Sequence, residues 1–178
     1  WVAGVIAFAV LDFAVWLEHV ASHKFHILWR IHRMHHSDVG FDLTTALRFH
    51  PLEIVLSMLW KALIIVALGA PAVAVLIFEI VLNGTAMFNH ANIRLPLWLD
   101  AIVRRVLVTP DMHRVHHSVH RDEHDSNYGF ALSIWDQMFG TYIAQPRGGH
   151  DDMQVGLEWQ DDRPARLGWS LSLPFARK

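Results

Sequence analysis

The stretch that decides the fold is residues 52–88, LEIVLSMLWKALIIVALGAPAVAVLIFEIVLNGTAMF. It contains two apolar runs of 17 residues, separated by an uncharged break at residues 69–71. A helix of 17 residues is about 25 Å long, near the lower limit for crossing the hydrocarbon core of a bilayer. Two buried helices of a soluble protein are the alternative. Since only three charged residues interrupt the stretch, a helical membrane hairpin is favoured.

A third apolar run, residues 1–17, carries a single charge. If this run also crosses the membrane, residues 18–51 and 89–178 emerge on the same side. Four Lys and Arg residues lie in the first of these segments and ten in the second, while the break between the hairpin helices has none. The positive-inside rule therefore places that side in the cytoplasm.

The composition of the chain is unusual in having 14 histidines and no cysteine among 178 residues. The absence of cysteine excludes a disulfide framework, thiolate metal sites and a cysteine nucleophile. A net charge of -2 argues against a nucleic-acid partner, since such proteins usually carry an excess of basic residues. A hydrophobic fraction of 53% agrees with a membrane protein.

Eleven of the histidines fall in two short windows, which the topology above places on the same membrane face. His19 and His23 are four residues apart and share one face of a helix. The pattern H-x-x-H-H occurs twice, as HRMHH at residues 32–36 and as HRVHH at residues 113–117. Adjacent residues of a helix point about 100° apart, so each pattern can serve two metal ions.

The donor set limits the chemistry of the predicted metal site. Imidazoles alone suit iron, zinc, copper or nickel, and eight of them exceed the four ligands of a tetrahedral zinc site. The H-E-x-x-H motif of zinc proteases is absent, because His19 is followed by Val-Ala-Ser. A single histidine is more often a surface or capping residue, and we interpret His26, His124 and His150 in that way.

The ordered segments HVASH (19–23), HRMHH (32–36) and HRVHH (113–117) resemble the three histidine boxes of the fatty acid hydroxylase/sterol desaturase superfamily. The strings RFHPLE (48–53), NYG (127–129) and WDQMFGTY (135–142) are similar as well. The likeness covers about residues 12–143. It is greatest to the bacterial sterol desaturase branch and looser to alkylglycerol monooxygenase. It implies an integral-membrane, non-haem di-iron oxygenase with O2 as co-substrate and two Fe ions, which zinc can replace in purified protein.

The resemblance also implies roles for individual residues. His90 is a ninth expected ligand because it follows the third apolar run, and His120 and His50 are further candidates. For His50, which precedes Pro51, capping of a helix is an equal alternative. Asp12, Glu123 and Asn127 are candidates for orienting the ligands through hydrogen bonds. The expected metal ligands are His19, His23, His32, His35, His36, His90, His113, His116 and His117.

These observations predict an all-α fold, an integral membrane helical bundle with a histidine-rich cytosolic helical cap. Residues 1–143 are expected to form the membrane domain, and residues 144–178 a cytosolic C-terminal tail packed on the cap. Family members usually have one more membrane helix before the first histidine box. We therefore expect that an N-terminal helix precedes Trp1 in the whole protein.

The predicted reaction is the hydroxylation or desaturation of a C–H bond in a lipid, such as a sterol or fatty acyl chain, in lipid biosynthesis. No G-x-G-x-x-G fingerprint for a nicotinamide or flavin cofactor is present. The resemblance thus implies a separate electron donor: a cytochrome b5, a ferredoxin or a reductase. The expected location is the bacterial inner membrane, with the active site on the cytoplasmic face. A zinc-dependent membrane hydrolase and a non-enzymatic metal transporter or store are the alternatives.

Overall fold

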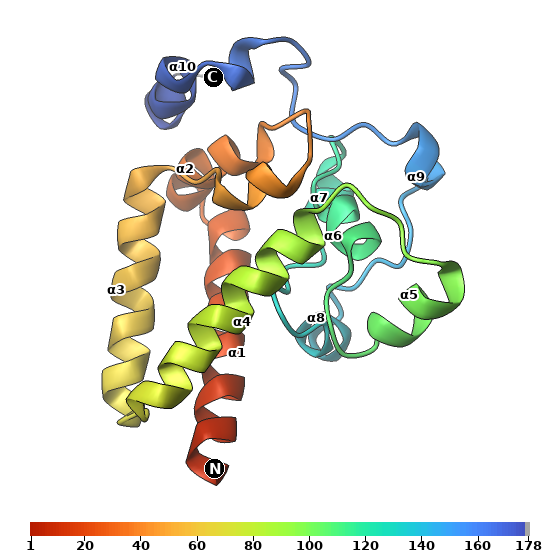
Figure 1. The fold of residues 1–178 in the computed structure, drawn as a ribbon. Helices are drawn as coiled ribbons and strands as arrows, with labels where there is room; N and C mark the ends of the chain where they lie inside the picture. The colour runs from red at the N-terminus through yellow and green to blue at the C-terminus, as the bar shows by residue number, and fades with distance from the viewer. Residues whose placement is uncertain (177–178) are drawn as a thin grey trace.

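Three long apolar helices form the part of the protein that is able to cross a membrane (Figure 1). In the computed structural model, which describes residues 1–176, they are α1 (Val2–Lys24), α3 (Pro51–Leu68) and α4 (Ala72–His90). Each is long and apolar enough to span a bilayer. Helices α1 and α4 run beyond the predicted apolar runs, because both continue in helical form through the histidines that follow.

Helices α3 and α4 form the predicted hairpin. Gly69 ends α3 in the left-handed conformation, with φ 59° and ψ 39°, which glycine adopts without steric cost. Across the hairpin, the Lys61 Nζ atom donates to Glu79 Oε1 at 2.6 Å. Two charges that would be costly in hydrocarbon therefore neutralise each other.

The apolar core lies where α1 crosses the hairpin. Leu11 and Val15 of α1 pack around Phe78 of α4, whose ring meets Phe8 edge to face at a centroid distance of 5.5 Å. Helix α3, in contrast, contains no buried residue, and Val66 is 79% exposed. Apolar surface of this extent is typical of helices that face lipid.

The chain folds back on α1 immediately after the first membrane helix. Phe25 has extended backbone angles, and the helix that follows is α2 (His26–His36). A short 3-10 helix, η1 (Leu43–Leu47), begins with a capping box made by Asp42 and leads into α3. The second histidine box is in this way carried back beside the first.

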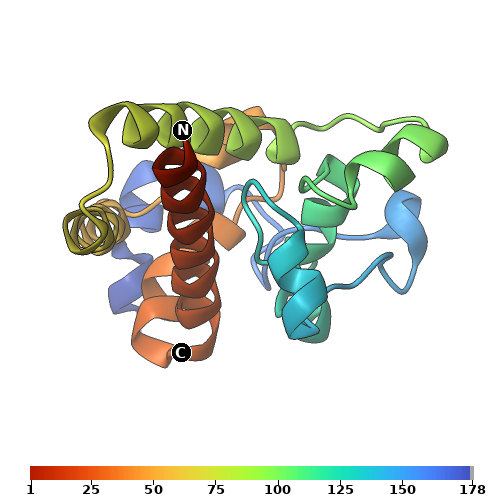
Figure 2. The ribbon, with the colours of Figure 1, turned by 90° about the horizontal axis from the view of Figure 1, so that it is seen from below.

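A cap of short helices lies to one side of α1 and α4 (Figure 2). Buried Asp136 fastens the cap to α1, since its carboxylate accepts a hydrogen bond from Trp16 Nε1 at 3.0 Å. The same carboxylate accepts from the backbone N–H groups of Tyr128 at 2.9 Å and Gly129 at 2.8 Å. The helices of the cap are α5 (Leu97–Val103), α6 (Pro110–His116), α7 (Arg121–His124) and α8 (Ile134–Phe139).

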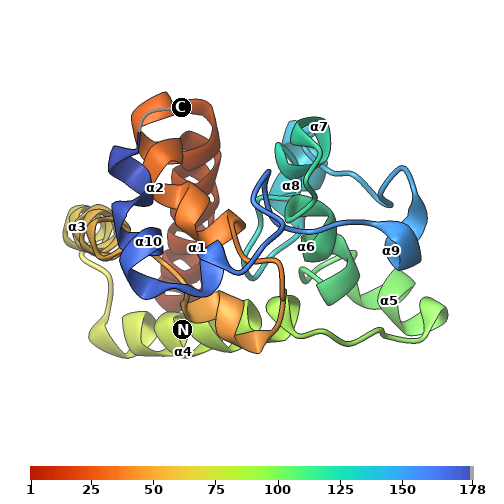
Figure 3. The ribbon, with the colours of Figure 1, turned by 90° about the horizontal axis from the view of Figure 1, so that it is seen from above.

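The C-terminal segment crosses the molecule and ends against α2 (Figure 3). Arg30 Nε of α2 donates to the Pro174 carbonyl at 2.6 Å, and Arg33 donates to the Leu173 carbonyl. The elements of this segment are α9 (Gly149–Asp152), η2 (Arg163–Ala165), α10 (Leu167–Ser172) and η3 (Leu173–Phe175).

The prediction of an all-α fold is confirmed for residues 1–176. This part of the chain contains no β-strand, and its only β-type pairings are two isolated bridges, Leu107 with Leu132 and Ser118 with Val155. Both bridges join segments of the polar C-terminal half and help to close the cap.

Replacing Gly129 with Ala should destabilise the cap. A Cβ atom at this position would lie 2.8 Å from the Leu132 carbonyl oxygen and 2.8 Å from Val108 Cγ2, and a backbone atom cannot move aside cheaply. We expect a loss of about 1–3 kcal/mol in the free energy of unfolding. Thermal unfolding of the detergent-solubilised protein measures it.

Gly168→Ala is the matched control, because nothing lies within 4 Å of a Cβ atom at this exposed helical glycine. It should leave the stability unchanged or raise it by up to about 1 kcal/mol. An equal effect of the two substitutions would contradict the tight packing at Gly129.

Candidate metal centre

Four separate segments bring their histidines to one place. His19 and His23 lie one turn apart near the end of α1, and the second box lies on α2, which folds back beside them. His90 ends α4, and the third box lies on α6 and its C-cap. The predicted ligands that meet in this way are His19, His23, His32, His35, His36, His90, His113, His116 and His117.

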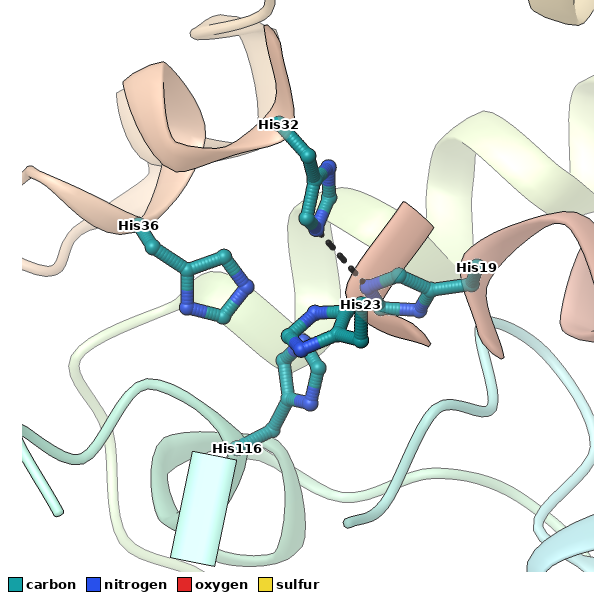
Figure 4. A group of neighbouring side chains, drawn as sticks. All are labelled: His19, His23, His32, His36 and His116. Carbon is teal, nitrogen blue, oxygen red and sulfur yellow. Dashed lines mark hydrogen bonds between the residues drawn. The ribbon is translucent and has the colours of Figure 1, made fainter. Parts of the chain in front are cut away.

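The nine histidines form two groups, and in each group the nitrogen atoms that could bind metal lie within 4.8 Å of one another. The rings of the larger group, which we call site 1, face a common centre (Figure 4). Site 2 adjoins it, since His36 of site 1 stacks on His117 of site 2 at a centroid distance of 4.6 Å. Site 1 consists of His19, His23, His32, His36 and His116, and site 2 of His35, His90, His113 and His117.

Each H-x-x-H-H pattern is divided between the two sites. His35 belongs to site 2 while His36 belongs to site 1, and His117 belongs to site 2 while His116 belongs to site 1. The angle of about 100° between adjacent residues of a helix explains this division. The arrangement fits two ions, as the spacing predicts.

Burial favours the neutral form of five of these rings. All nine are buried, and many of their nitrogen atoms have no hydrogen-bond partner among residues 1–176, including both nitrogens of His36 and of His117. Burial lowers the pKa of His35, His36, His113, His116 and His117 well below the usual value, and the neighbouring imidazoles lower each pKa further. Neutral imidazole is the form that binds metal.

Hydrogen bonds to the outer nitrogen orient several rings. His19 Nδ1 donates to the Tyr128 carbonyl at 2.7 Å, and His116 Nδ1 donates to the Ser126 carbonyl at 2.6 Å. His32 Nδ1 lies 2.5 Å from Glu53 Oε1, and His90 Nδ1 donates to the Ala86 carbonyl at 2.7 Å. In neutral rings with a proton on Nδ1, each Nε2 atom has a free lone pair.

The Nε2 atoms of several rings lie close together within each site. His19 Nε2 and His32 Nε2 lie 3.1 Å apart, joined by the dashed line in Figure 4. In site 2, His90 Nε2 lies 3.1 Å from His113 Nε2 and 3.2 Å from His35 Nε2. Buried imidazole nitrogens at these separations can hold a cation between them. The residues present therefore fit bound metal ions, and this donor set suits iron, zinc, copper or nickel.

His50 and His120, named as further candidate ligands, lie outside both sites. His50 caps α3, accepting from the Leu52 N–H through Nδ1 at 3.1 Å, and its Nε2 atom lies 3.3 Å from the Leu171 carbonyl. His120 is exposed. The contacts of His50 therefore agree with its interpretation as a helix cap.

His124, which we interpreted as a residue without a role, lies beside site 1. It forms a third histidine–aspartate group with His23 and Asp125, and its ring stacks on Trp29 at a centroid distance of 5.1 Å. Its Nδ1 atom donates to the Ser118 carbonyl at 3.1 Å. Sequence spacing did not indicate this position, because His124 lies beyond the third box on a separate helix, α7.

The three candidates for orienting ligands have other partners in the structure. Asp12 accepts from Trp135 Nε1 at 2.7 Å, and Glu123 accepts from Ser118 Oγ and from the Arg147 N–H. Asn127 donates to the carbonyls of Met112 and Ile143. Within residues 1–176, none of the three is hydrogen-bonded to one of the nine histidines. The carbonyls on either side of Asn127 orient His19 and His116 instead.

Two carboxylates contact box histidines, Glu53 at His32 and, at the longer distance of 3.4 Å, Asp125 at His23; neither was among the candidates for this role. Glu53 makes the closer contact. It lies within the string RFHPLE, at the third position of α3, where a carboxylate also interacts favourably with the helix dipole. Its contact with His32 depends on how α2 and α3 pack. The similarity of the RFHPLE string to the superfamily is the sequence feature that could have indicated this role of Glu53.

The comparisons with known proteins give two kinds of relative. An ornithine lipid hydroxylase, OlsE, from Rhizobium tropici is 30% identical over 98% of this chain and 50% of its own length. Alkylglycerol monooxygenase from Homo sapiens is 33% identical over 78% of this chain and 30% of its own length. This chain therefore spans half or less of these relatives. No solved structure matches it.

The family comparison agrees with the histidine boxes. The model of the family described as fatty acid hydroxylase matches residues 4–141, which include all nine histidines of the two sites. Each histidine box lies within the match. The chain belongs to the fatty acid hydroxylase family.

Proposed function

We propose that the protein is a membrane-bound oxygenase that hydroxylates or desaturates a C–H bond of a lipid, such as a sterol, a fatty acyl chain or a related molecule. The observation that carries the proposal is the pair of buried, all-histidine sites at the end of membrane-spanning helices. The names of the relatives, a lipid hydroxylase and a lipid monooxygenase, support the same class of reaction.

The proposed cofactor is a pair of iron ions. The five histidines of site 1 and the four of site 2 would hold one ion each. When bound, the two ions would supply the redox chemistry that allows O2 to oxidise an unactivated C–H bond. The side chains of this chain bind and orient the ions. Buried carbonyls and Glu53 hold the rings of His19, His32, His90 and His116 in position.

The protein also brings a lipid close to these sites. His19 and His32 line a cavity of about 230 Å³ between α1, α3 and α4, and the rest of its wall is mainly apolar. Val15, Leu82 and Phe130 are among the side chains that bound it. A hydrocarbon chain fits this lining and can enter sideways from the membrane, where α3 exposes its apolar side chains.

The proposed oxygenase needs an electron donor and a defined orientation in the membrane. Electrons would come from a separate donor, a cytochrome b5, a ferredoxin or a reductase, and both metal sites would lie on the cytoplasmic face of a bacterial inner membrane. Residues 1–143 would form the catalytic membrane domain, with residues 144–178 as a tail on the cytosolic side. The excess of Lys and Arg outside the hairpin supports this orientation.

The structure gives little support to a metal transporter. Such a protein needs unpaired polar groups along its membrane helices. Here Lys61 and Glu79, the charged residues of the hairpin at membrane depth, pair with each other, and Glu18 and Glu53 lie beside site 1 at the ends of their helices. Metal analysis separates the oxygenase from a zinc-dependent hydrolase, since the oxygenase should contain about two irons per chain when it is expressed with iron.

His116→Ala should abolish lipid oxidation, because the substitution removes a buried nitrogen from site 1. His26→Ala is the matched control, since His26 is exposed and lies outside both sites. The measurement compares lipid extracts of cells that express each variant by mass spectrometry, looking for a gain of one oxygen or a loss of two hydrogens. Undiminished product with His116→Ala would contradict the assignment of site 1.

Glu53→Gln should weaken metal binding by about 10- to 100-fold, because the carboxylate that orients His32 and strengthens its basicity is lost. Competition with a chelator of known affinity measures the change. Asp162→Asn is the control, since Asp162 is exposed, pairs with Arg166 and lies outside both sites. Equal metal retention in the two variants would show that Glu53 does not support the site.

A further inference from the structure

Two cavities meet beside site 1. The cavity that contains His19 and His32 extends along α3 and α4, and a second cavity of about 440 Å³ lies between α1, α2 and α3. Both are lined by Glu18, Ser22 and Glu53. These three side chains therefore lie between the two cavities, next to site 1.

Both cavities are bounded in part by exposed apolar side chains. Leu47, which lines the first cavity, is 72% exposed, and Phe25, which lines the second, is 63% exposed. Their walls are otherwise mostly apolar, with Ile54 and Leu82 in the first and Leu56 in the second. Hydrocarbon can therefore occupy each cavity on either side of the polar side chains.

Two carboxylates in this apolar setting need an explanation. Ser57 Oγ donates to Glu18 Oε2 at 3.1 Å, and Glu53 Oε1 contacts His32. Glu53 Oε2 is buried without a hydrogen-bond partner among the described residues. Lys61, two turns along α3 from Glu53, is engaged by Glu79. Buried acceptors without partners are costly, so they are typical of a site that receives hydrogen bonds from a ligand.

We propose that Glu18 and Glu53 receive the polar end of the lipid substrate, and that this end carries hydrogen-bond donors, either hydroxyl or amine groups. The inference rests on the proposed function and names its substrate class. A carboxylate only accepts hydrogen bonds, so it selects donors and rejects esters and ethers that have none. Lipids without a donor would leave Glu53 Oε2 without a hydrogen-bond partner and would add none to Glu18.

The position of the carboxylates also sets where the lipid is oxidised. Glu18 precedes His19 in the chain, and Glu53 touches His32, so the polar end lies directly beside site 1. The C–H bond nearest to the metal is then within a few bonds of the polar group, and the hydrocarbon tail extends away along the cavities. The far end of the tail would not be oxidised.

A binding experiment on the metal-loaded full chain in phosphatidylcholine nanodiscs tests the inference without requiring turnover. The probes are radiolabelled 1-O-hexadecylglycerol, an ornithine lipid, and the 2,3-di-O-methyl ether of hexadecylglycerol, which has no donor. We expect the wild-type protein to bind at least one donor lipid roughly tenfold or more tightly than the dimethyl ether. Equal affinity for all three would overturn the inference, and this comparison requires no variant.

Variants of Glu18 test whether this side chain causes the preference for lipids with hydrogen-bond donors. Glu18→Leu should abolish the preference for donor lipids, whereas Glu158→Leu, at an exposed position outside both cavities, should retain it. Glu18→Gln should weaken binding of an amine more than binding of a hydroxyl, because only the amine depends on the negative charge. A folded Glu18→Leu variant that keeps the wild-type preference would contradict the role of Glu18.

Analysis of the product separates this inference from the proposed function. If tandem mass spectrometry places the new oxygen or double bond near the polar group, both are supported. Oxidation confined to the far end of the tail would overturn the inference and leave the oxygenase intact. Selective binding of donor lipids with no oxidation under reducing conditions would contradict the proposed function, while the binding site would stand.

Discussion

The rest of the structure depends on the need to bury nine imidazoles in two groups, with the nitrogen atoms of each group within 4.8 Å of one another. Such an arrangement is unfavourable in itself, because buried nitrogens lose their hydrogen bonds to water. Four segments must therefore be held rigidly from outside. The backbone carbonyls of Ala86, Ser126 and Tyr128, together with Glu53, supply that support by fixing the outer nitrogens of four rings.

Polar residues outside the two sites hold the segments together. Asp136 joins the loop that carries Tyr128 to Trp16 of α1, and Asp12 of α1 accepts from Trp135 in the cap. These contacts tie the cap to the membrane helix that bears the first histidine box. The charged residues of the hairpin have a separate structural role, since Lys61 and Glu79 neutralise each other. Within residues 1–176, the hydrogen-bond partner of Glu18 is a hydroxyl group, that of Ser57, which distinguishes it from the structural carboxylates.

Local sequence patterns predicted the features that depend on neighbouring residues along one helix. The three apolar runs became α1, α3 and α4, and the divergence of adjacent histidines placed His35 and His36 in different sites. Patterns were less informative where the partner comes from a distant segment. Glu53 contacts a histidine 21 residues earlier, and His124 approaches His23 from another helix. Asn127 lies in the loop that orients His19 and His116. The contacts come from the backbone carbonyls of its two neighbours, however, and a pattern of side chains does not predict backbone contacts.

The sequence by itself determined the apolar hairpin and the divergence of adjacent histidines within each H-x-x-H-H pattern, because hydropathy and helical periodicity act within single segments. Only the tertiary structure decided which groups orient each ring, why His50 and His120 lie apart from the sites, and how Glu18 comes to face a cavity beside His19. Those outcomes depend on the turn at Phe25 and on the packing of α2 against α1 and α3. Side chains far apart in the chain meet only when the helices that carry them cross.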